Sequence, residues 1–321
     1  MKKKILLAGG GGYIGSLLTQ KLLDRDYDVT VADLLWFGNH LPVDKIDLWK
    51  KNIMDIKSDE LVGFDAVVFM AGLSNDPMAD FNPAMNFIEN TAVPAYLAYI
   101  SKKAGVNRFI YAGSCSVYGY SAEKLMYEDS EASLSPEYPY GISKLAGERV
   151  ILDLEDNEFK PIILRKGTVG GWSPRMRYDL VVNAMTKTAL TKGKIVVHNP
   201  SLWRPIIDIN DVCTAYVRSI ESNPFLSGVY NICYDNYTIG RLAEEIREEL
   251  KDHGFEIELE ILNRQDVRNY KACNTKAKVE LDFVPSTPPR QSVKNILENI
   301  GDNFDFSDKK YYNIKVFKEL K

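Results

Sequence analysis

The chain has 321 residues, with 40 lysines and arginines, 44 aspartates and glutamates, and a formal net charge of −4. This length can bury a large core, while the mild and dispersed charge is unlike the basic surface of a nucleic-acid-binding protein. The first apolar run is too short for a signal or membrane segment, so we expect a cytoplasmic protein without nucleic-acid or membrane partners. Four cysteines and three histidines are widely scattered, which favours reduced thiols and predicts no metal site.

The N-terminal region predicts a strand, a glycine-rich turn and a helix. Residues 3–8 form a short apolar run typical of a buried strand, and residues 13–23 carry apolar side chains at helical spacing. Between them, Gly9, Gly12 and Gly15 match the dinucleotide-binding pattern of a tight turn, close approach to a pyrophosphate and close helix packing. A flexible glycine hinge is the alternative. The acidic residue that follows where the pattern requires one favours the nucleotide site.

That acidic residue is Asp33, at the end of a second predicted strand over residues 27–33. A carboxylate there accepts hydrogen bonds from both ribose hydroxyls and repels a 2′-phosphate. No arginine follows Asp33 to bind such a phosphate. The sequence therefore predicts NAD rather than NADP.

Strands and helices continue to alternate along the first half of the chain. Further strand candidates lie at residues 46–50, 65–70, 107–112 and 160–165, with helical stretches at 82–104 and 140–155. This rhythm predicts an α/β fold with a Rossmann-type, doubly wound parallel sheet and ligands at the strand C-terminal ends. After Arg165 the rhythm loosens. We expect an NAD-binding domain over residues 1–165 and a smaller, mainly substrate-binding C-terminal domain over 166–321, with some segments returning to the sheet.

Tyr140 and Lys144 lie four residues apart at the start of a predicted helix, so both project from one face. An ammonium group there would favour the phenolate and lower a phenol pKa of about 10 toward the working range of an acid/base. Such a pair is usually ordinary helix surface. The glycine-rich turn at the start of the same chain favours a hydride-transfer site instead.

The chain resembles, nearly end to end, the extended short-chain dehydrogenases/reductases of the nucleotide-sugar epimerase/dehydratase family. No single motif is specific, but their order and spacing are. The motifs are the glycine turn, Asp33, Asp55-Ile56, Met70-Ala71-Gly72, Asn90, Ser114-Cys115-Ser116-Val117-Tyr118-Gly119, Tyr140-Gly141-Ile142-Ser143-Lys144, and Arg204-Pro205-Ile206-Ile207-Asp208-Ile209-Asn210-Asp211.

The resemblance implies a cofactor site at the matching positions. Asp55 and Ile56 would contact the adenine, and Asn90 would hold the backbone near the nicotinamide. Without the resemblance, Asp55 reads as a cap of the next turn and Asn90 as a solvated helix residue. The implied cofactor-binding residues are Gly9, Gly12, Tyr13, Ile14, Gly15, Asp33, Asp55, Ile56, Met70, Ala71, Gly72, Asn90, Tyr140 and Lys144.

The resemblance also implies that Ser114, Tyr140 and Lys144 are catalytic, with Ser114 bonded to the reacting sugar oxygen and Tyr140 as acid/base. From the residues alone, Cys115 or Ser116 would serve equally well, and the spacing to the following Val-Tyr-Gly selects Ser114. The implied substrate-binding residues are Ser114, Arg175, Arg177, Asn183, Arg204 and Arg268. Arg204 would bind the nucleotide diphosphate and the loop 264–270 would form a second contact. Solvated surface arginines are the alternative.

Two departures from the family narrow the function. In 4,6-dehydratases an acid pair follows the catalytic hydroxyl residue, and here those positions are Cys115 and Ser116, so dehydration is disfavoured. At Lys166-Gly167-Thr168, many sugar 4-epimerases carry an aromatic or small residue and then an asparagine that contacts the substrate phosphate, so the substrate cannot be inferred by comparison with them.

We therefore expect an NAD-dependent epimerase that oxidises a nucleotide-diphosphate sugar at C4 and returns the hydride to the opposite face. A C4 dehydrogenase or a 4-keto reductase uses the same residues. A non-catalytic dinucleotide-binding protein is the rival class, and retention of Ser114, Tyr140 and Lys144 argues against it. The family resemblance further implies a homodimer formed through the helices that follow residues 82 and 140.

Overall fold

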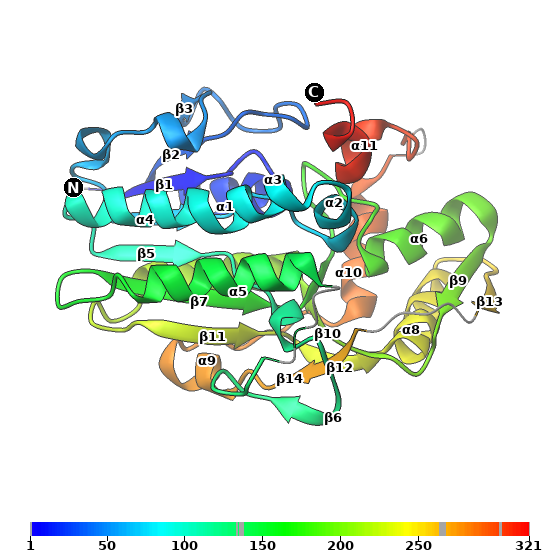
Figure 1. The fold of residues 1–321 in the computed structure, drawn as a ribbon. Helices are drawn as coiled ribbons and strands as arrows, with labels where there is room; N and C mark the ends of the chain where they lie inside the picture. The colour runs from blue at the N-terminus through cyan, green and yellow to red at the C-terminus, as the bar shows by residue number, and fades with distance from the viewer. Residues whose placement is uncertain (1, 133, 135–137, 263–267, 302–303, 321) are drawn as a thin grey trace.

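The structure is a computed structural model that describes residues 2–132, 134, 138–262, 268–301 and 304–320. Its centre is a seven-stranded, entirely parallel sheet with the strand order β11-β7-β5-β4-β1-β2-β3 (Figure 1). The strands are β1 (Lys4–Ala8), β2 (Asp28–Ala32), β3 (Asp47–Trp49), β4 (Ala66–Phe69), β5 (Arg108–Tyr111), β7 (Lys160–Lys166) and β11 (Gly228–Ile232). The predicted doubly wound α/β fold is confirmed.

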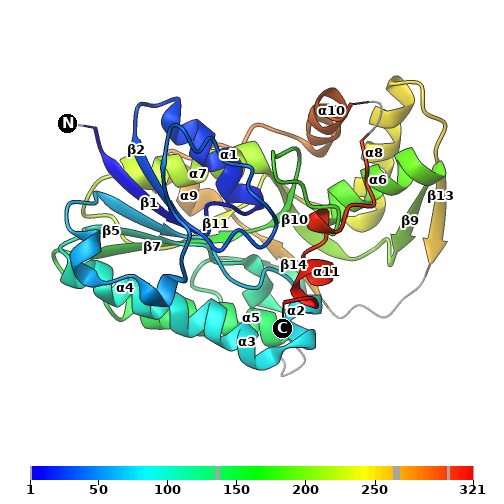
Figure 2. The same ribbon diagram turned by 90° about the horizontal axis from the view of Figure 1, so that it is seen from above.

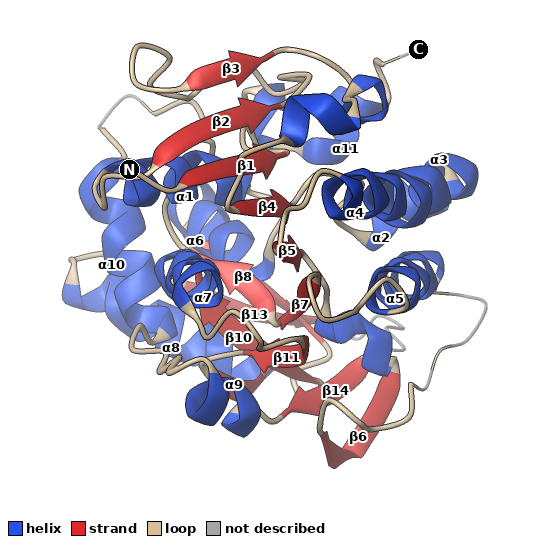
Figure 3. Ribbon diagram, turned by 90° about the vertical axis from the view of Figure 1, so that its left-hand side faces the viewer, coloured by secondary structure: helices blue, strands red, loops and turns tan. Residues whose placement is uncertain are grey.

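Helices cover both faces of this sheet, which is why its strands read as nearly continuous apolar runs (Figure 3). On one face, α1 (Tyr13–Leu23) and α7 (Ile209–Glu221) pack against side chains such as Leu7 and Val68. On the other, α4 (Val93–Lys103) packs against alternate side chains such as Leu6 and Val67, with α5 (Pro139–Leu152) beside it. Neighbouring residues of one strand thus enter two different cores.

The chain changes direction across the sheet at β1, because β2 and β3 lie on one side of it and β4, β5 and β7 on the other. In such sheets a crevice opens beyond the carboxyl ends of the strands at this switch point. Gly9 directly follows β1 and Met70 directly follows β4. The fold therefore places both predicted motifs at the same edge.

The connections beyond β3 and β4 contain short elements. These are η1 (Ile53–Asp55), η2 (Ser58–Leu61), α2 (Asp76–Phe81), α3 (Pro83–Phe87), the π-helical turn η3 (Ile88–Ala92) and η4 (Cys115–Tyr118). The predicted helix over 82–104 is thus three consecutive pieces, since Pro83 starts one helix and the π turn interrupts the rest.

The second half builds a smaller core beside the carboxyl edge of the large sheet, formed by residues such as Val182, Ile206, Leu242 and Val293 (Figure 2). Two small sheets, β12-β10-β8 and β13-β9, come from the second half, and a third, β14-β6, pairs a strand of the second half with one from the first. The elements are β6 (Tyr120–Met126), β8 (Thr168–Gly170), α6 (Val181–Lys192), β9 (Lys194–His198), β10 (Trp203–Asp208), β12 (Asp235–Thr238), α8 (Ile239–Asp252), β13 (Glu258–Leu262), β14 (Asn269–Ala272), α9 (Thr275–Glu280), α10 (Pro289–Asn299), η5 (Lys309–Tyr311) and α11 (Asn313–Phe317).

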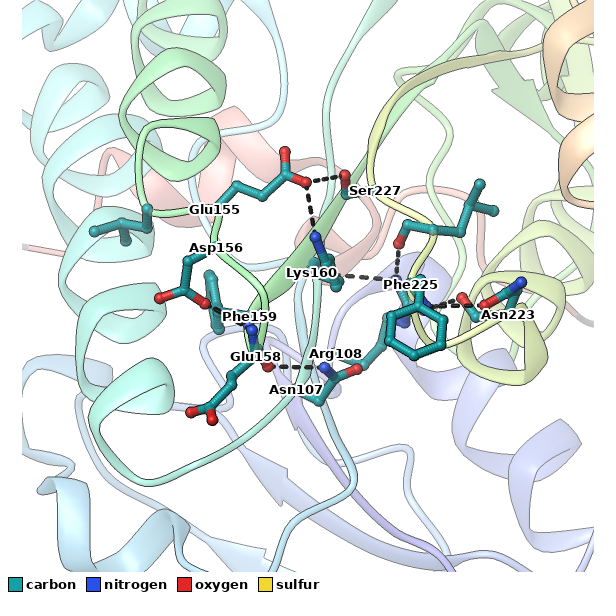
Figure 4. Close-up of polar contacts among 12 residues, drawn as sticks. Asn107, Arg108, Glu155, Asp156, Glu158, Phe159, Lys160, Asn223, Phe225 and Ser227 are labelled. Carbon is teal, nitrogen blue, oxygen red and sulfur yellow. Dashed lines mark hydrogen bonds and ion pairs between the residues drawn. The ribbon is translucent and has the colours of Figure 1, made fainter.

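Strand β11 comes from the second half but forms the edge of the large sheet beside β7. The loop that leads into it is held by Arg108, whose Nη1 donates to the carbonyls of Leu226 (2.5 Å) and Lys160 (3.1 Å) and whose Nη2 donates to that of Asn223 (2.7 Å) (Figure 4). These bonds lie at the amino ends of β5 and β7, opposite the crevice. They join the two halves of the chain without occupying the site.

No helix within the described residues is long and apolar enough to span a membrane. In the same residues no cluster of histidine, cysteine and carboxylate side chains has the geometry of a metal site.

Candidate active site

A cavity of about 240 Å³ lies beyond the carboxyl ends of β1, β2 and β4. Gly12 is the N-cap of α1 and provides no side-chain cap, so N–H groups of the first turn face the cavity. Gly9 has φ +90°, and a Cβ atom on it would stand 2.4 Å from the Ala71 nitrogen. A Cβ on Gly15 would stand 2.5 Å from the Gly10 Cα. The turn therefore has the backbone approach and the helix packing that a dinucleotide pyrophosphate requires.

Asp33 lines this cavity at the end of β2. Its Oδ2 accepts the Gly11 N–H at 2.8 Å and its Oδ1 accepts the Leu35 N–H at 2.7 Å, which fixes the carboxylate plane. Burial raises the pKa of Asp33, and the two backbone bonds oppose that rise. Each oxygen keeps a further lone pair that can accept a ribose hydroxyl.

Asp55 and Ile56, the expected adenine contacts, do not line this cavity, and their contact with adenine stays a prediction. Ile56 is fully buried in the core under the sheet, and its carbonyl accepts the Tyr96 hydroxyl at 2.8 Å. Asp55 is exposed at the end of η1. The cavity is lined at this end by Asn52 and Ile53 instead, three positions nearer to β3, because the chain turns into η1 directly after the strand.

Tyr13 is held rigidly between the halves of the chain. Its hydroxyl donates to the Gly171 carbonyl at 2.6 Å and accepts the Asn183 Nδ2 at 3.1 Å. Asn183 also binds the Gly171 N–H at 2.9 Å and the Arg177 carbonyl at 2.9 Å. Asn183 is fully buried, and its expected contact with substrate stays a prediction. Its hydrogen bonds position Tyr13 and the loop after β8.

A second cavity of about 660 Å³ adjoins the first, and the two share wall residues that include Tyr13, Met70, Ala71, Gly72 and Arg177. Ser114, Tyr140 and Lys144, predicted as a catalytic group, all line this second cavity. They come from the end of β5 and the first turns of α5. The fold brings together residues that stand up to 30 positions apart in the sequence.

Ser114 is the hydroxyl that faces Tyr140. Its Oγ accepts the Ser116 N–H at 3.2 Å and the Ser116 hydroxyl at 2.8 Å, and a side-chain hydrogen bond joins it to Tyr140. Cys115 is fully buried and its Sγ donates to the Arg165 carbonyl at 3.1 Å. The structure therefore selects Ser114 over the neighbouring cysteine by direction as well as by spacing.

The protonation of Tyr140 and Lys144 differs from the expectation. Lys144 Nζ lies 6.0 Å from the centre of the Tyr140 ring and 5.0 Å from that of Tyr111. Burial lowers the pKa of Lys144 to about 7, while burial and the nearby Asp76 raise the pKa of Tyr140 above its ordinary value. Loss of water around both groups outweighs the predicted stabilisation of a phenolate by the ammonium.

Lys166 is a cavity residue that the sequence reading did not assign to the site. It is the last residue of β7 and pairs with Ser114 in an isolated parallel bridge, and its Nζ donates to the Gly113 carbonyl at 2.8 Å. Burial and the neighbouring Lys144 lower its pKa. Two amines thus share this end of the cavity.

Asn90 lies in the π-helical turn η3 and is fully buried. Its Nδ2 donates to the Leu73 carbonyl at 2.9 Å and to Asn86 Oδ1 at 2.8 Å, while its carbonyl accepts the Tyr111 hydroxyl at 2.8 Å. It shapes the loop after β4 from behind. This is the supporting position that the resemblance implied, rather than a direct contact.

Three of the four predicted substrate-binding arginines line the larger cavity. Arg204 Nη1 donates to the Trp203 carbonyl at 2.8 Å and to the Arg268 carbonyl, with the guanidinium 5.4 Å from the Tyr270 ring centre. Arg268 Nη1 pairs with Asp76 at 2.5 Å. Residues 264–267 of the predicted second loop lie outside the described ranges.

Arg177 lies where the two cavities meet. It pairs with Asp179 through Nη2 at 2.8 Å and donates to Ser74 Oγ through Nη1 at 3.0 Å. Arg175 lines the cofactor-sized cavity and not the larger one, and its predicted role in substrate binding stays a prediction. The turn after Gly171 directs the side chains of Arg175 and Arg177 differently, which the sequence spacing does not show.

The far end of the larger cavity is lined by Val196, Leu202, Ile239 and His198. The His198 Nδ1 is buried and has no hydrogen-bond partner among the described residues. This end is mostly apolar and lies beside Arg204, so it suits a flat group attached to a phosphate.

Comparison with known proteins shows the family and the fold of the chain. Residues 5–233 match the NAD-dependent epimerase/dehydratase family. A probable UDP-arabinose 4-epimerase of Oryza sativa subsp. japonica is 24% identical over 318 residues, which cover 87% of this chain and 77% of the relative. A UDP-N-acetylglucosamine 4-epimerase from Methanobrevibacter ruminantium M1, solved with UDP-N-acetylmuramic acid, has a TM-score of 0.81 at 24% identity, covering 94% of this chain and 100% of that one. MoeE5, solved with UDP-glucose and NAD, has a TM-score of 0.79 at 23% identity, covering 92% and 97%.

Proposed function

Because the chain belongs to the NAD-dependent epimerase/dehydratase family, whose cofactor is NAD, we propose that it is a nucleotide-diphosphate-sugar epimerase that acts by reversible oxidation at C4. The observation that carries this proposal is the hydrogen bond between Tyr140 and Ser114 in a cavity that shares its wall with the cofactor cavity. Bound NAD would supply the acceptor and donor of the hydride.

The residues of the chain divide the remaining work. Tyr140 would take the proton of the C4 hydroxyl and later return it, and Ser114 would orient that hydroxyl by a hydrogen bond. Lys144 is buried beside them, where its amino group could donate hydrogen bonds to the hydroxyls of a bound ribose. Arg204 and Arg268 carry the positive charge that a diphosphate needs in the same cavity.

The carboxylates of the cavity argue against a 4,6-dehydratase. Asp76 is paired with Arg268, and Asp179 is paired with Arg177. Each is neutralised by a cation rather than placed as an acid/base. Since Cys115 and Ser116 also replace the dehydratase acid pair, the larger cavity supports transfer of one hydride and one proton without removal of the C6 hydroxyl.

A panel of nucleotide sugars tests the proposal. The purified protein would be mixed with UDP-, GDP-, dTDP- and CDP-linked hexoses, pentoses and uronic acids, with absorbance of the reduced nicotinamide and product mass and stereochemistry as readouts. We expect one nucleotide sugar to give its C4 epimer without net reduction of NAD. Stoichiometric accumulation of reduced NAD with a keto product would identify a C4 dehydrogenase, and no reaction with any member would support a binding protein.

We further propose a homodimer formed through α3, η3, α4 and α5, which lie together on one face of the molecule (Figure 1). Large apolar side chains are exposed there, with Phe87 52%, Tyr99 50% and Val150 43% exposed. A second copy would cover them. Light scattering after gel filtration should give twice the mass of the chain, and Tyr99→Glu should give the monomer mass.

A further inference from the structure

Arg175 is an arginine that is almost completely buried, 1% exposed, and its side-chain hydrogen bonds involve no carboxylate. Its Nη2 donates to Asn313 Oδ1 at 2.5 Å and to the Lys310 carbonyl at 3.2 Å, and its guanidinium lies 3.8 Å from the centre of the Phe37 ring. All of these partners are neutral. Within the described part of the chain it has no ion-pair partner, whereas Arg177, two residues away, is paired with Asp179.

One polar atom of this side chain has no partner. The Arg175 Nε is buried and makes no hydrogen bond to any described residue. Burial and repulsion from Arg177 lower the pKa of Arg175 to about 9, although the charges of Asp179 and Asp33 oppose this shift. A buried cation is costly unless an anion accompanies it. The arrangement is complete only when an anion is bound.

The position of Arg175 identifies that anion. It lines the cofactor cavity together with Gly12 and Asp33, and it is absent from the lining of the larger cavity. Asp33 is placed for a ribose, and the uncapped first turn of α1 begins at Gly12. Between a ribose site and a helix N-terminus, a dinucleotide carries its pyrophosphate. We infer that Arg175, contributed by the second half of the chain, binds the pyrophosphate of NAD.

The C-terminal segment would hold the arginine in place. Asn313, which accepts from Arg175, also donates through Nδ2 to Ser74 Oγ at 2.8 Å. Phe317 of the same helix, α11, stacks on Trp36 at 6.1 Å and contacts Phe81 edge-on at 5.9 Å. The segment thus runs from the second half onto the cofactor side of the first half (Figure 2). Asn313 is the positioning residue and Arg175 the contact with phosphate.

A ligand series separates this role from a purely structural one. Dissociation constants of adenosine, ADP-ribose, NAD and NADP would be measured by calorimetry on nucleotide-free full-length protein. Arg175→Met retains a side chain that can pack on Phe37. We expect it to weaken the binding of ADP-ribose and NAD by about 10- to 100-fold, while the dissociation constant of adenosine changes less than about twofold. The dissociation constants of Arg175→Lys should lie between those of the unaltered protein and Arg175→Met, because lysine keeps the charge but lacks the paired N–H donors of the guanidinium group.

Two further variants serve as controls. Arg241→Met removes an exposed arginine on α8 and should change no dissociation constant. Asn313→Ala keeps Arg175 but removes the hydrogen bond that orients it. It should therefore weaken the binding of the same ligands by a smaller factor, and it remains informative if Arg175→Met does not fold. Equal losses for adenosine and ADP-ribose, or no loss for either, would overturn the inference. A loss of affinity for NADP alone would also overturn the inference, because it would assign Arg175 to the 2′-phosphate.

Discussion

Tyr140→Phe removes one hydroxyl group from the larger cavity and leaves the ring in place. The hydroxyl's hydrogen bond to Ser114 is worth about 1 kcal/mol to folding, so the free energy of unfolding should change little. A positioned proton-transfer group contributes about 10²- to 10⁴-fold to rate, which corresponds to about 3–5 kcal/mol of activation free energy. The loss of turnover should therefore greatly exceed the loss of stability.

The assay compares Tyr140→Phe, Ser114→Ala and the unaltered protein with the nucleotide sugar that the panel identifies. Turnover is followed by product formation, NAD content by absorbance after denaturation, and stability by thermal melting. Ser114→Ala loses one orienting bond and should be the milder variant. Both should retain NAD.

The pH dependence gives a second readout. Oxidation requires Tyr140 as a base, and burial raises its pKa, so the deprotonated fraction and the oxidation rate should increase from neutral to alkaline pH. Tyr140→Phe should lose that increase. Near-normal turnover of Tyr140→Phe at neutral pH would refute the assignment, and so would an unchanged alkaline rise.

Three other changes test separate parts of the structure. Asp33→Ala should narrow the preference for NAD over NADP, measured by dissociation constants; equal affinity of the unaltered protein for both would contradict the ribose role. Arg204→Ala should raise KM for the nucleotide sugar and weaken binding of the transition state by about 1.5–3 kcal/mol, with NAD content unchanged. Arg165→Met should lower the free energy of unfolding in urea by about 3–5 kcal/mol, because Glu148, bonded to Arg165 at 2.5 and 2.9 Å, is left buried and unpaired; Arg165→Met with Glu148→Leu should recover most of it.

Local sequence features predicted the large sheet well, and the residues predicted for the site lie close together in the structure. The strand over 3–8, the glycine turn and the helix over 13–23 form within one stretch of chain, and the structure has them as β1 (Lys4–Ala8), the turn and α1 (Tyr13–Leu23). The spacing of Tyr140 and Lys144 is likewise a property of one helix. Periodicity suffices where an element and its ligand-facing residues are contiguous.

The sequence could not predict where a side chain lies when its position depends on residues far away along the chain. Arg175 faces the cofactor cavity because Asn313 and Phe37 hold it there, more than 130 positions away on either side. Asn183 is withdrawn from the cavity by its bonds to Tyr13 and Gly171. The short turn η1 after β3 has a local effect, because it places Asn52 and Ile53 on the cavity wall rather than Asp55 and Ile56. A single sequence contains no local signal for any of these.

The pairing of β11 with β7 has a consequence for the order in which the molecule can assemble during synthesis. Strand β7 ends at Lys166, but the neighbour that covers its free edge begins only at Gly228. A ribosome-bound chain that has extended past β7 therefore displays a long, apolar, unpaired edge until some 60 further residues have emerged. Fragments that end between these strands should aggregate, whereas chains that continue through Ile232 can close the sheet.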